Sequence, residues 1–216
     1  MLVRRVRQES ANPKLTVLVV QLGEFTREGR DFMGMREVQR KFIIEDGNAL
    51  LVPTLGRPLK DTVHLNNKGY QELGCEIGRA LLRTKYRKHD VNWPGPVLDA
   101  VVLNADGNSV VAHFSEVKRL HGCIPQDFAV LDSKGAEVCV SVKPGETIVE
   151  LKFARSIQIL AKLVYGFGEN PKAVLEDEAG NRAPAVQITM ATGAPSKDIP
   201  TNATNGAGTK ASKAGL

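Results

Sequence analysis

The sequence predicts an α/β unit that forms part of a doubly wound sheet, followed by a small antiparallel β-sandwich. Two observations predict this order. In the first part, an apolar run at residues 15–22 is followed by a helical pattern at 31–44 and a second short apolar run at 49–53, as in a strand, a helix and a parallel strand. Beyond residue 96, short alternating runs recur with turn residues between them, which is typical of a sandwich.

The first strand and the first helix differ in the period of their apolar residues. Residues 15–22 are rich in β-branched side chains without polar alternation, so we expect a strand that is covered on both faces. The helix that follows has charged residues on one side and ends at Gly47. A second strand at 49–53 ends at Pro53, which cannot donate to a sheet ladder. The predicted buried stripe of the helix consists of Phe32, Met35, Val38, Phe42 and Ile43.

A second long helix is predicted after residue 66. Asn66 or Asn67 provides its N-cap, and the helical pattern extends to about residue 86. Gly74 and Gly78 lie one turn apart, which costs stability relative to alanine and indicates a close approach to the sheet. The buried stripe of this helix is expected to use Tyr70, Leu73, Ile77, Ala80 and Leu81.

A candidate site lies in the loop that precedes this helix, where Asp61 stands three residues before His64. A carboxylate in that position can accept the Nδ1 proton of the imidazole while Nε2 faces a nucleophile. Ligands in doubly wound folds gather beyond the carboxyl ends of the parallel strands, and both residues follow the strand at 49–53. The alternative is an ordinary loop pair, in which the aspartate caps a turn and the histidine is solvated.

The change of composition near residue 90 predicts two domains and a tail. A basic stretch and a Pro/Gly-rich segment at 85–96 indicate a linker, so we expect an α/β unit at 1–90, a β-sandwich at 91–190 and a disordered tail at 191–216. Two parallel strands alone lack partners at both edges, so the order of elements implies that preceding strands are absent. The predicted sandwich strands lie at 97–102, 109–114, 128–131, 137–142, 147–153, 157–164 and 185–188.

The composition is that of an ordinary globular chain and excludes several classes of function. Of the 216 residues, 42% are hydrophobic and 25% charged. The net charge of +5 is spread through mixed-sign stretches, which favours a solvated surface over a nucleic-acid partner. The three cysteines form no CxxC pair, so neither a metal site nor a disulfide framework is indicated, although one bridge between Cys123 and Cys139 stays open. No stretch has the length and apolarity of a membrane span.

Three separated motifs resemble one family of hydrolases. Residues 61–74 (DTVHLNNKGYQELG) resemble the last motif block of the SGNH (GDSL-like) hydrolases, and more narrowly that of the sialate O-acetylesterase group of carbohydrate esterases. Residues 36–39 (REVQ) are similar to the Arg-Glu-Ala-Gln element of that group. Residues 165–171 (YGFGENP) are similar to its closing Tyr-Gly-x-x-x-Asn-Pro segment. The matches occur in the family's order over most of residues 15–190.

The resemblance implies a flavodoxin-like, three-layer esterase domain that removes acetyl groups from a sugar or an acylated glycan. In the family, a serine attacks the acetyl carbonyl while the histidine takes its proton. His64 would then be the general base and Asp61 its orienting carboxylate, with no metal or organic cofactor required. The family's nucleophile block precedes everything matched here, and Ser10 precedes the first strand. We therefore expect the nucleophile to be absent from this chain and to come from an upstream chain or segment.

Three further residues are candidates for binding an acetylated carbohydrate. Arg36 and Gln39 lie three residues apart on the first helix and either face the substrate cleft or share a solvated face. Arg57, near the loop of Asp61, either meets a sugar carboxylate or is solvated. The second hypothesis is a non-catalytic protein in which residues 96–190 bind a glycan or a partner. No apolar secretion signal follows Met1, so the chain as written is expected in the cytoplasm, although members of the family are often secreted.

Overall fold

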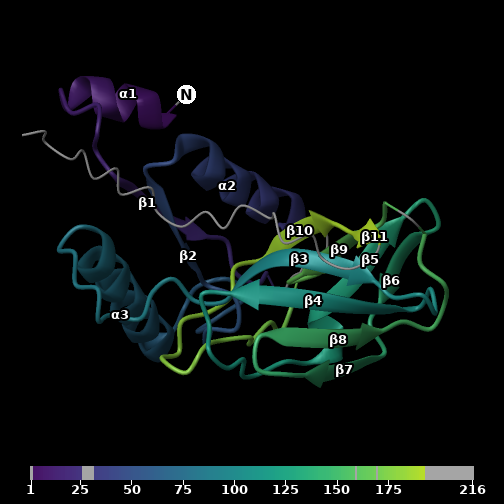
Figure 1. The fold of residues 1–216 in the computed structure, drawn as a ribbon. Coiled ribbons are helices and arrows are strands. Elements are labelled where there is room, and N and C mark those ends of the chain that lie inside the picture. Colours follow the sequence, from purple (N-terminus) through teal and green to yellow (C-terminus); the bar gives the residue numbers. More distant parts are fainter. Residues whose placement is uncertain (1, 26–31, 159, 169, 193–216) are drawn as a thin grey trace, which may run out of the picture.

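The computed structural model describes residues 2–25, 32–158, 160–168 and 170–192 (Figure 1). The first part contains a parallel pair of strands, β1 (Val17–Gln21) and β2 (Ala49–Pro53), joined through helix α2 (Met33–Asp46). Helix α3 (Asn67–Thr84) follows β2, and a short helix α1 (Leu2–Glu9) precedes β1. Figure 1 shows α2 and α3 on either side of the strand pair, and both helices contact β2. The predicted strand–helix–strand–loop–helix order is confirmed.

The described residues of the second part form two mainly antiparallel sheets. Their strands are β3 (Val97–Leu103), β4 (Ser109–Ser115), β5 (Phe128–Asp132), β6 (Gly135–Val138), β7 (Ser141–Pro144), β8 (Ile148–Lys152), β9 (Lys162–Tyr165), β10 (Val186–Thr189) and β11 (Ala191–Thr192), with a short 3-10 helix η1 (Pro125–Asp127) before β5. One has the order β10-β9-β5-β6, and the other has the order β11-β3-β4-β8-β7, in which β11 pairs with β3 in parallel. The predicted strand at 137–142 is in fact two strands, β6 and β7, which belong to different sheets.

Two hydrophobic cores hold these parts. The larger core takes side chains from both antiparallel sheets, among them Val110 and Leu151 of one sheet and Phe128 and Leu163 of the other, all at most 1% exposed. The smaller core lies between β2 and α3. Leu55, in the loop after β2, belongs to the larger core rather than to the smaller one. The segment that carries Asp61 and His64 is therefore anchored between the two cores. The residues of the smaller core are Val52, Leu65, Leu73 and Ala80.

The burial of α2 differs from the prediction. Met35 and Val38 of the predicted apolar stripe are 50% and 59% exposed, whereas Arg36 and Glu37 are buried. The helix turns its polar side inward because Arg36 and Glu37 form hydrogen bonds with the backbone near β9 and in β10. The strand β1 is also not covered on both faces, since Val20 is 38% exposed.

Helix α3 follows its predicted pattern only in part. Asn66 is the N-cap, and its side chain accepts a hydrogen bond from the Gly69 N–H at 2.9 Å. Leu73 and Ala80 are buried as predicted, but Tyr70 is 57% exposed. The expected close approach of Gly74 and Gly78 to the sheet is wrong, because a Cβ at either position would meet no atom within 4 Å.

The division into domains at residue 90 stays a prediction. Buried polar contacts join the two parts, as when the Gln21 side chain bonds to both the N–H and the carbonyl of Ala185, at 2.8 and 3.0 Å. The predicted disordered tail lies outside the described residues, apart from the strand β11 at its start. All three cysteines are free, so the bridge between Cys123 and Cys139 is not formed. Among the described helices, none is long and apolar enough to cross a membrane.

Candidate active site

The loop between β2 and α3 is closed at its base by main-chain bonds. Leu59 and Leu65 form an isolated antiparallel bridge, and the Lys60 N–H donates to the His64 carbonyl at 2.8 Å. Leu65 is 8% exposed in the smaller core. This anchoring leaves residues 60–64 as a short turn beyond the carboxyl end of β2.

Asp61 and His64 contact each other within this turn. The His64 Nδ1 lies 2.9 Å from Oδ2 and 3.1 Å from Oδ1 of Asp61. The Asp61 Oδ1 also accepts the backbone N–H groups of His64 and Val63, at 2.8 and 3.0 Å. These backbone bonds, followed by the bond to the imidazole, hold the pKa of Asp61 well below its usual range. The carboxylate therefore stays ionised and fixes the ring through Nδ1.

The imidazole is open to solvent on its other side. The side chains of His64 and Asp61 are 68% and 48% exposed, so Nε2 is not sealed in the core. Within the described residues, no serine hydrogen-bonds to His64. His64 and Asp61 are thus arranged like the base and the orienting carboxylate of a hydrolytic triad. Their catalytic role stays a prediction.

The start of α3 fixes this turn from the other side. The backbone of Gly69 passes so close to the loop that an added Cβ would lie 2.5 Å from the Pro58 carbonyl oxygen and 3.1 Å from the Leu65 Cβ. The Asn66 N–H donates to the same Pro58 carbonyl at 2.9 Å. Glycine at position 69 thus permits the close contact between the start of α3 and the loop, and this contact sets the direction in which the chain enters the helix.

A cavity of about 370 Å³ lies beside Asp61, within the range of about 300–1,000 Å³ that is usual for ligand pockets. Its wall combines Glu24, which follows β1, with the segment after β2. The third part of the wall is the segment after β9. This segment includes the end of the sequence motif at 165–171. The residues that line it are Glu24, Gly56, Arg57, Pro58, Leu59, Asp61, Asn170, Lys172 and Val174.

Arg57 lines this cavity, but its guanidinium is engaged elsewhere. The residue is 3% exposed. Its Nη2 contacts the Glu76 carboxylate, its Nη1 lies 3.7 Å from Glu72, and its Nε donates to the Pro53 carbonyl at 3.3 Å. Burial raises the pKa of Glu76 to about 7, against the opposing charge of Arg57. Arg57 is therefore not solvated, and its predicted contact with a sugar carboxylate would have to compete with two glutamates.

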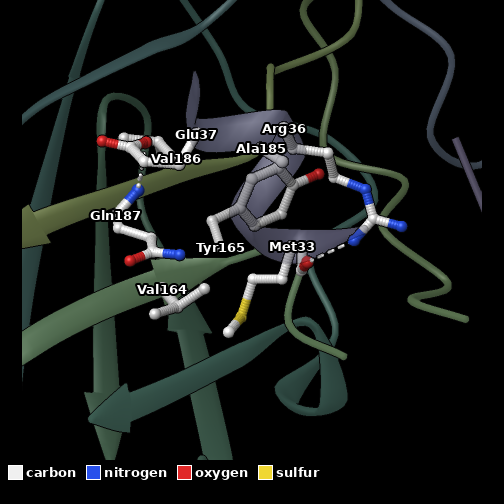
Figure 2. A pocket seen from close by; sticks show the side chains of 9 residues that line it. Met33, Arg36, Glu37, Val164, Tyr165, Ala185, Val186 and Gln187 are labelled. Carbon is white, nitrogen blue, oxygen red and sulfur yellow. Dashed lines mark hydrogen bonds between the residues drawn. The ribbon is translucent and has the colours of Figure 1, made fainter. Parts of the chain in front are cut away.

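Arg36 lies in the contact between α2 and the second part of the chain rather than on a solvated face. Figure 2 shows Arg36 and Glu37 facing Tyr165, Ala185 and Gln187. Arg36 donates to at least four backbone carbonyls, those of Leu22, Gly23, Gly166 and Gly168. The space between these side chains is too small for a water molecule.

Gln39 likewise bonds to the backbone beside β1, accepting the Leu22 N–H at 2.9 Å and donating to the Val20 carbonyl at 3.3 Å. These contacts give Arg36 and Gln39 a structural role. Their contact with a substrate stays a prediction that the geometry does not support.

Glu24 and Lys172 are the charged cavity residues that sequence reasoning missed. Glu24 stands just beyond the carboxyl end of β1, which is the place where ligands gather in such folds, so its position was a usable signal. Lys172 comes one residue after the Asn-Pro pair of the third motif. Neither residue belongs to a local pattern with His64, and only the folded chain brings the three segments together.

The family comparison matches residues 1–83 to carbohydrate esterases described as sialic acid-specific acetylesterases. This range includes β1, α2, β2 and the turn of Asp61 and His64. No curated protein matches the chain.

Among solved structures, a novel carbohydrate acetylesterase from Xanthomonas citri is similar with a TM-score of 0.67 and 19% identity. The match covers 86% of this chain and 44% of that one, so the chain spans less than half the length of that esterase. The S-layer protein SbsC matches with a TM-score of 0.39 and 16% identity, over 59% of this chain and 17% of that chain. The likeness to the acetylesterase extends into the second part of the chain, beyond the range of the family match.

Proposed function

We propose that the chain forms part of an O-acetylesterase acting on a carbohydrate, because residues 1–83 match the carbohydrate esterase family described as sialic acid-specific acetylesterases. We also propose that β1, α2, β2 and α3 are the last elements of a doubly wound, SGNH-type domain. The two antiparallel sheets would then form a sandwich appended to that domain. The contact between Asp61 and His64 at the carboxyl end of β2 is the observation that carries it.

In the proposed reaction, His64 is the general base and Asp61 its orienting group. The Nε2 of His64 takes the hydroxyl proton of a serine as the serine oxygen bonds to the acetyl carbon. The imidazolium, stabilised by the ionised Asp61, then gives that proton to the departing sugar oxygen. A water molecule attacks the acetyl-serine with His64 again as base, and acetate leaves. The serine is proposed to come from an upstream chain or segment, because the family's nucleophile block precedes the motifs that this chain matches.

The test joins the chain to an upstream segment that carries a Gly-x-Ser nucleophile block and follows hydrolysis of p-nitrophenyl acetate. We expect little turnover by the chain alone and clear turnover by the joined protein. His64→Ala should lower that turnover by about 10⁴-fold or more. His89→Ala, an exposed histidine outside the site, is the matched control and should leave it unchanged. Turnover by the joined protein that survives His64→Ala would contradict the proposal.

A non-catalytic glycan- or partner-binding protein is the second candidate. Its specific support is that no serine within the described part of the chain bonds to His64. A serine-directed fluorophosphonate separates the two candidates, because it labels an activated serine. Labelling of the joined protein that depends on His64 supports the esterase. Glycan binding by residues 96–190 without any labelling supports the second candidate.

A further inference from the structure

The cavity beside Asp61 contains a buried carboxylate with one oxygen available. Glu24 is 5% exposed, and its Oε1 accepts the Gly56 N–H at 2.7 Å. Its Oε2 is buried and has no hydrogen-bond partner among the described residues. An unpaired buried carboxylate oxygen is costly, so a ligand hydroxyl that donates to Oε2 would offset that cost.

The charges around the cavity disfavour an anionic ligand. Two carboxylates, Glu24 and Asp61, line it. Of the two cations on its wall, Arg57 is held by Glu72 and Glu76, and Lys172 lies close enough for its charge to act on Glu24. A ligand carboxylate would therefore meet two like charges and one cation that already faces an acid. Juxtaposed like charges disfavour such a ligand relative to a neutral one.

The remaining wall suits an uncharged polyhydroxylated ring. Leu59 and Val174 supply apolar surface, and Asn170 supplies an amide that both donates and accepts. The Lys172 ammonium can donate to a ring or acetyl oxygen. A mainly apolar wall with a few placed polar groups is the usual composition of a small-ligand site.

We propose that this cavity holds the ring of a neutral sugar, with Glu24 Oε2 accepting a ring hydroxyl, and that the site discriminates against sugars that carry a carboxylate. The proposal rests on the proposed function in that the bound ring would carry the acetyl group presented to His64. It separates this chain from sialic acid, the anionic sugar that the family description names.

Binding to the ¹⁵N-labelled chain is measured by NMR, without any need for turnover. The neutral probes are the methyl glycosides of glucose, galactose and xylose, and the anionic probe is the methyl glycoside of N-acetylneuraminic acid. We expect at least one neutral glycoside to shift the amides of Glu24, Gly56 and Lys172 and to bind at least about tenfold more tightly than the anionic one.

Glu24→Gln keeps the size of the side chain and the bond to Gly56 but loses the charge. The variant should bind the neutral glycoside about tenfold more weakly and the anionic one more tightly. Glu45→Gln removes an exposed charge on α2 that does not line the cavity and should change neither affinity.

The proposal is overturned if the anionic glycoside binds as tightly as the neutral ones, if no neutral glycoside binds, if the shifts lie away from the cavity, or if Glu24→Gln changes nothing. These results are separable from a failure of the proposed function. Neutral sugar bound at the cavity of a protein that never hydrolyses acetyl esters would leave this proposal standing and remove the esterase. Hydrolysis that prefers acetylated sialic acid would do the reverse.

Discussion

Asp127 is a carboxyl group that folding removes from water without giving it a hydrogen bond of good geometry among the described residues. The residue ends η1 and is 0% exposed, and neither of its oxygens has a partner of good geometry among the described residues. Burial raises the pKa of Asp127 to about 7; the neighbouring charge of Glu24 adds to the rise and the Val174 N–H opposes it. An aspartate in the unfolded chain has a pKa of about 3.9.

The pH dependence of stability follows from this difference. Between about pH 4 and pH 7 the unfolded chain has lost the Asp127 proton while the folded chain keeps it, so ionisation favours unfolding as the pH rises. The free energy of unfolding should fall by up to about 1.4 kcal/mol per pH unit in that window from this group alone.

Asp127→Asn isolates this contribution, because the amide cannot ionise. The stability of the variant relative to the wild type, measured by urea unfolding, should be constant below about pH 4, rise up to about pH 7 and then level off. A difference that does not change with pH would show that Asp127 finds a partner when it ionises.

At the scale of elements, the close packing of α3 against the loop before it depends on Gly69 and not on Gly74 or Gly78. Gly69 approaches the Pro58 carbonyl, whereas open space surrounds Gly74. The sequence pattern favoured Gly74 and Gly78 as the close contacts because their spacing of one turn is a local signal. The approach of Gly69 depends instead on the path of the loop from 54 to 66, which local spacing does not encode.

Alanine substitutions at these two glycines should therefore have opposite effects. Gly74→Ala is expected to raise the free energy of unfolding by about 0.5–1 kcal/mol, because alanine loses less backbone entropy in a helix. Gly69→Ala gains the same entropy but places its Cβ against a backbone oxygen, and a net loss of about 1–3 kcal/mol is expected. Thermal or urea unfolding of the two variants checks this, and stabilisation by both would mean that the loop does not pack as described.

At the scale of the whole molecule, the two parts of the chain are joined through buried polar side chains. The Arg36 Nη1 bonds to the Gly166 carbonyl, 130 residues away in the chain, and Glu37 bonds to the Gln187 N–H, 150 residues away. Because of these bonds, α2 buries Arg36 and Glu37, and the predicted buried apolar stripe of α2 is wrong. A helical period assigns polar residues to solvent by default, and it carries no information on a partner so distant in sequence.

Features with local causes were predictable. Gly47 ends α2 with φ +65° and Asn66 caps α3, as their residue types indicate. Asp61 and His64 are brought together by their three-residue spacing in the turn. The cavity beside them was not predictable, because Glu24 and Lys172 reach it from separate segments.

Substitution of Arg36 tests how much the contact between α2 and the second part of the chain contributes to the stability of the whole molecule. Arg36→Met leaves at least four backbone carbonyls without their donor, and we expect a loss of about 3 kcal/mol or more in the free energy of unfolding. Met35→Ala, at the neighbouring position that is 50% exposed, should change it by less than about 0.5 kcal/mol. Equal effects of the two substitutions would show that the helix does not turn its polar side inward.

The central claim is that the carboxylate of Asp61 holds the proton on Nδ1 of His64 and leaves Nε2 free to act as a base. Nitrogen-15 NMR of the imidazole, recorded on the unmodified chain at a pH where the ring is neutral, reports which nitrogen carries the proton. We predict protonation at Nδ1 in the wild type, and loss of this preference in Asp61→Asn. A ring protonated mainly at Nε2 in the wild type would contradict the account.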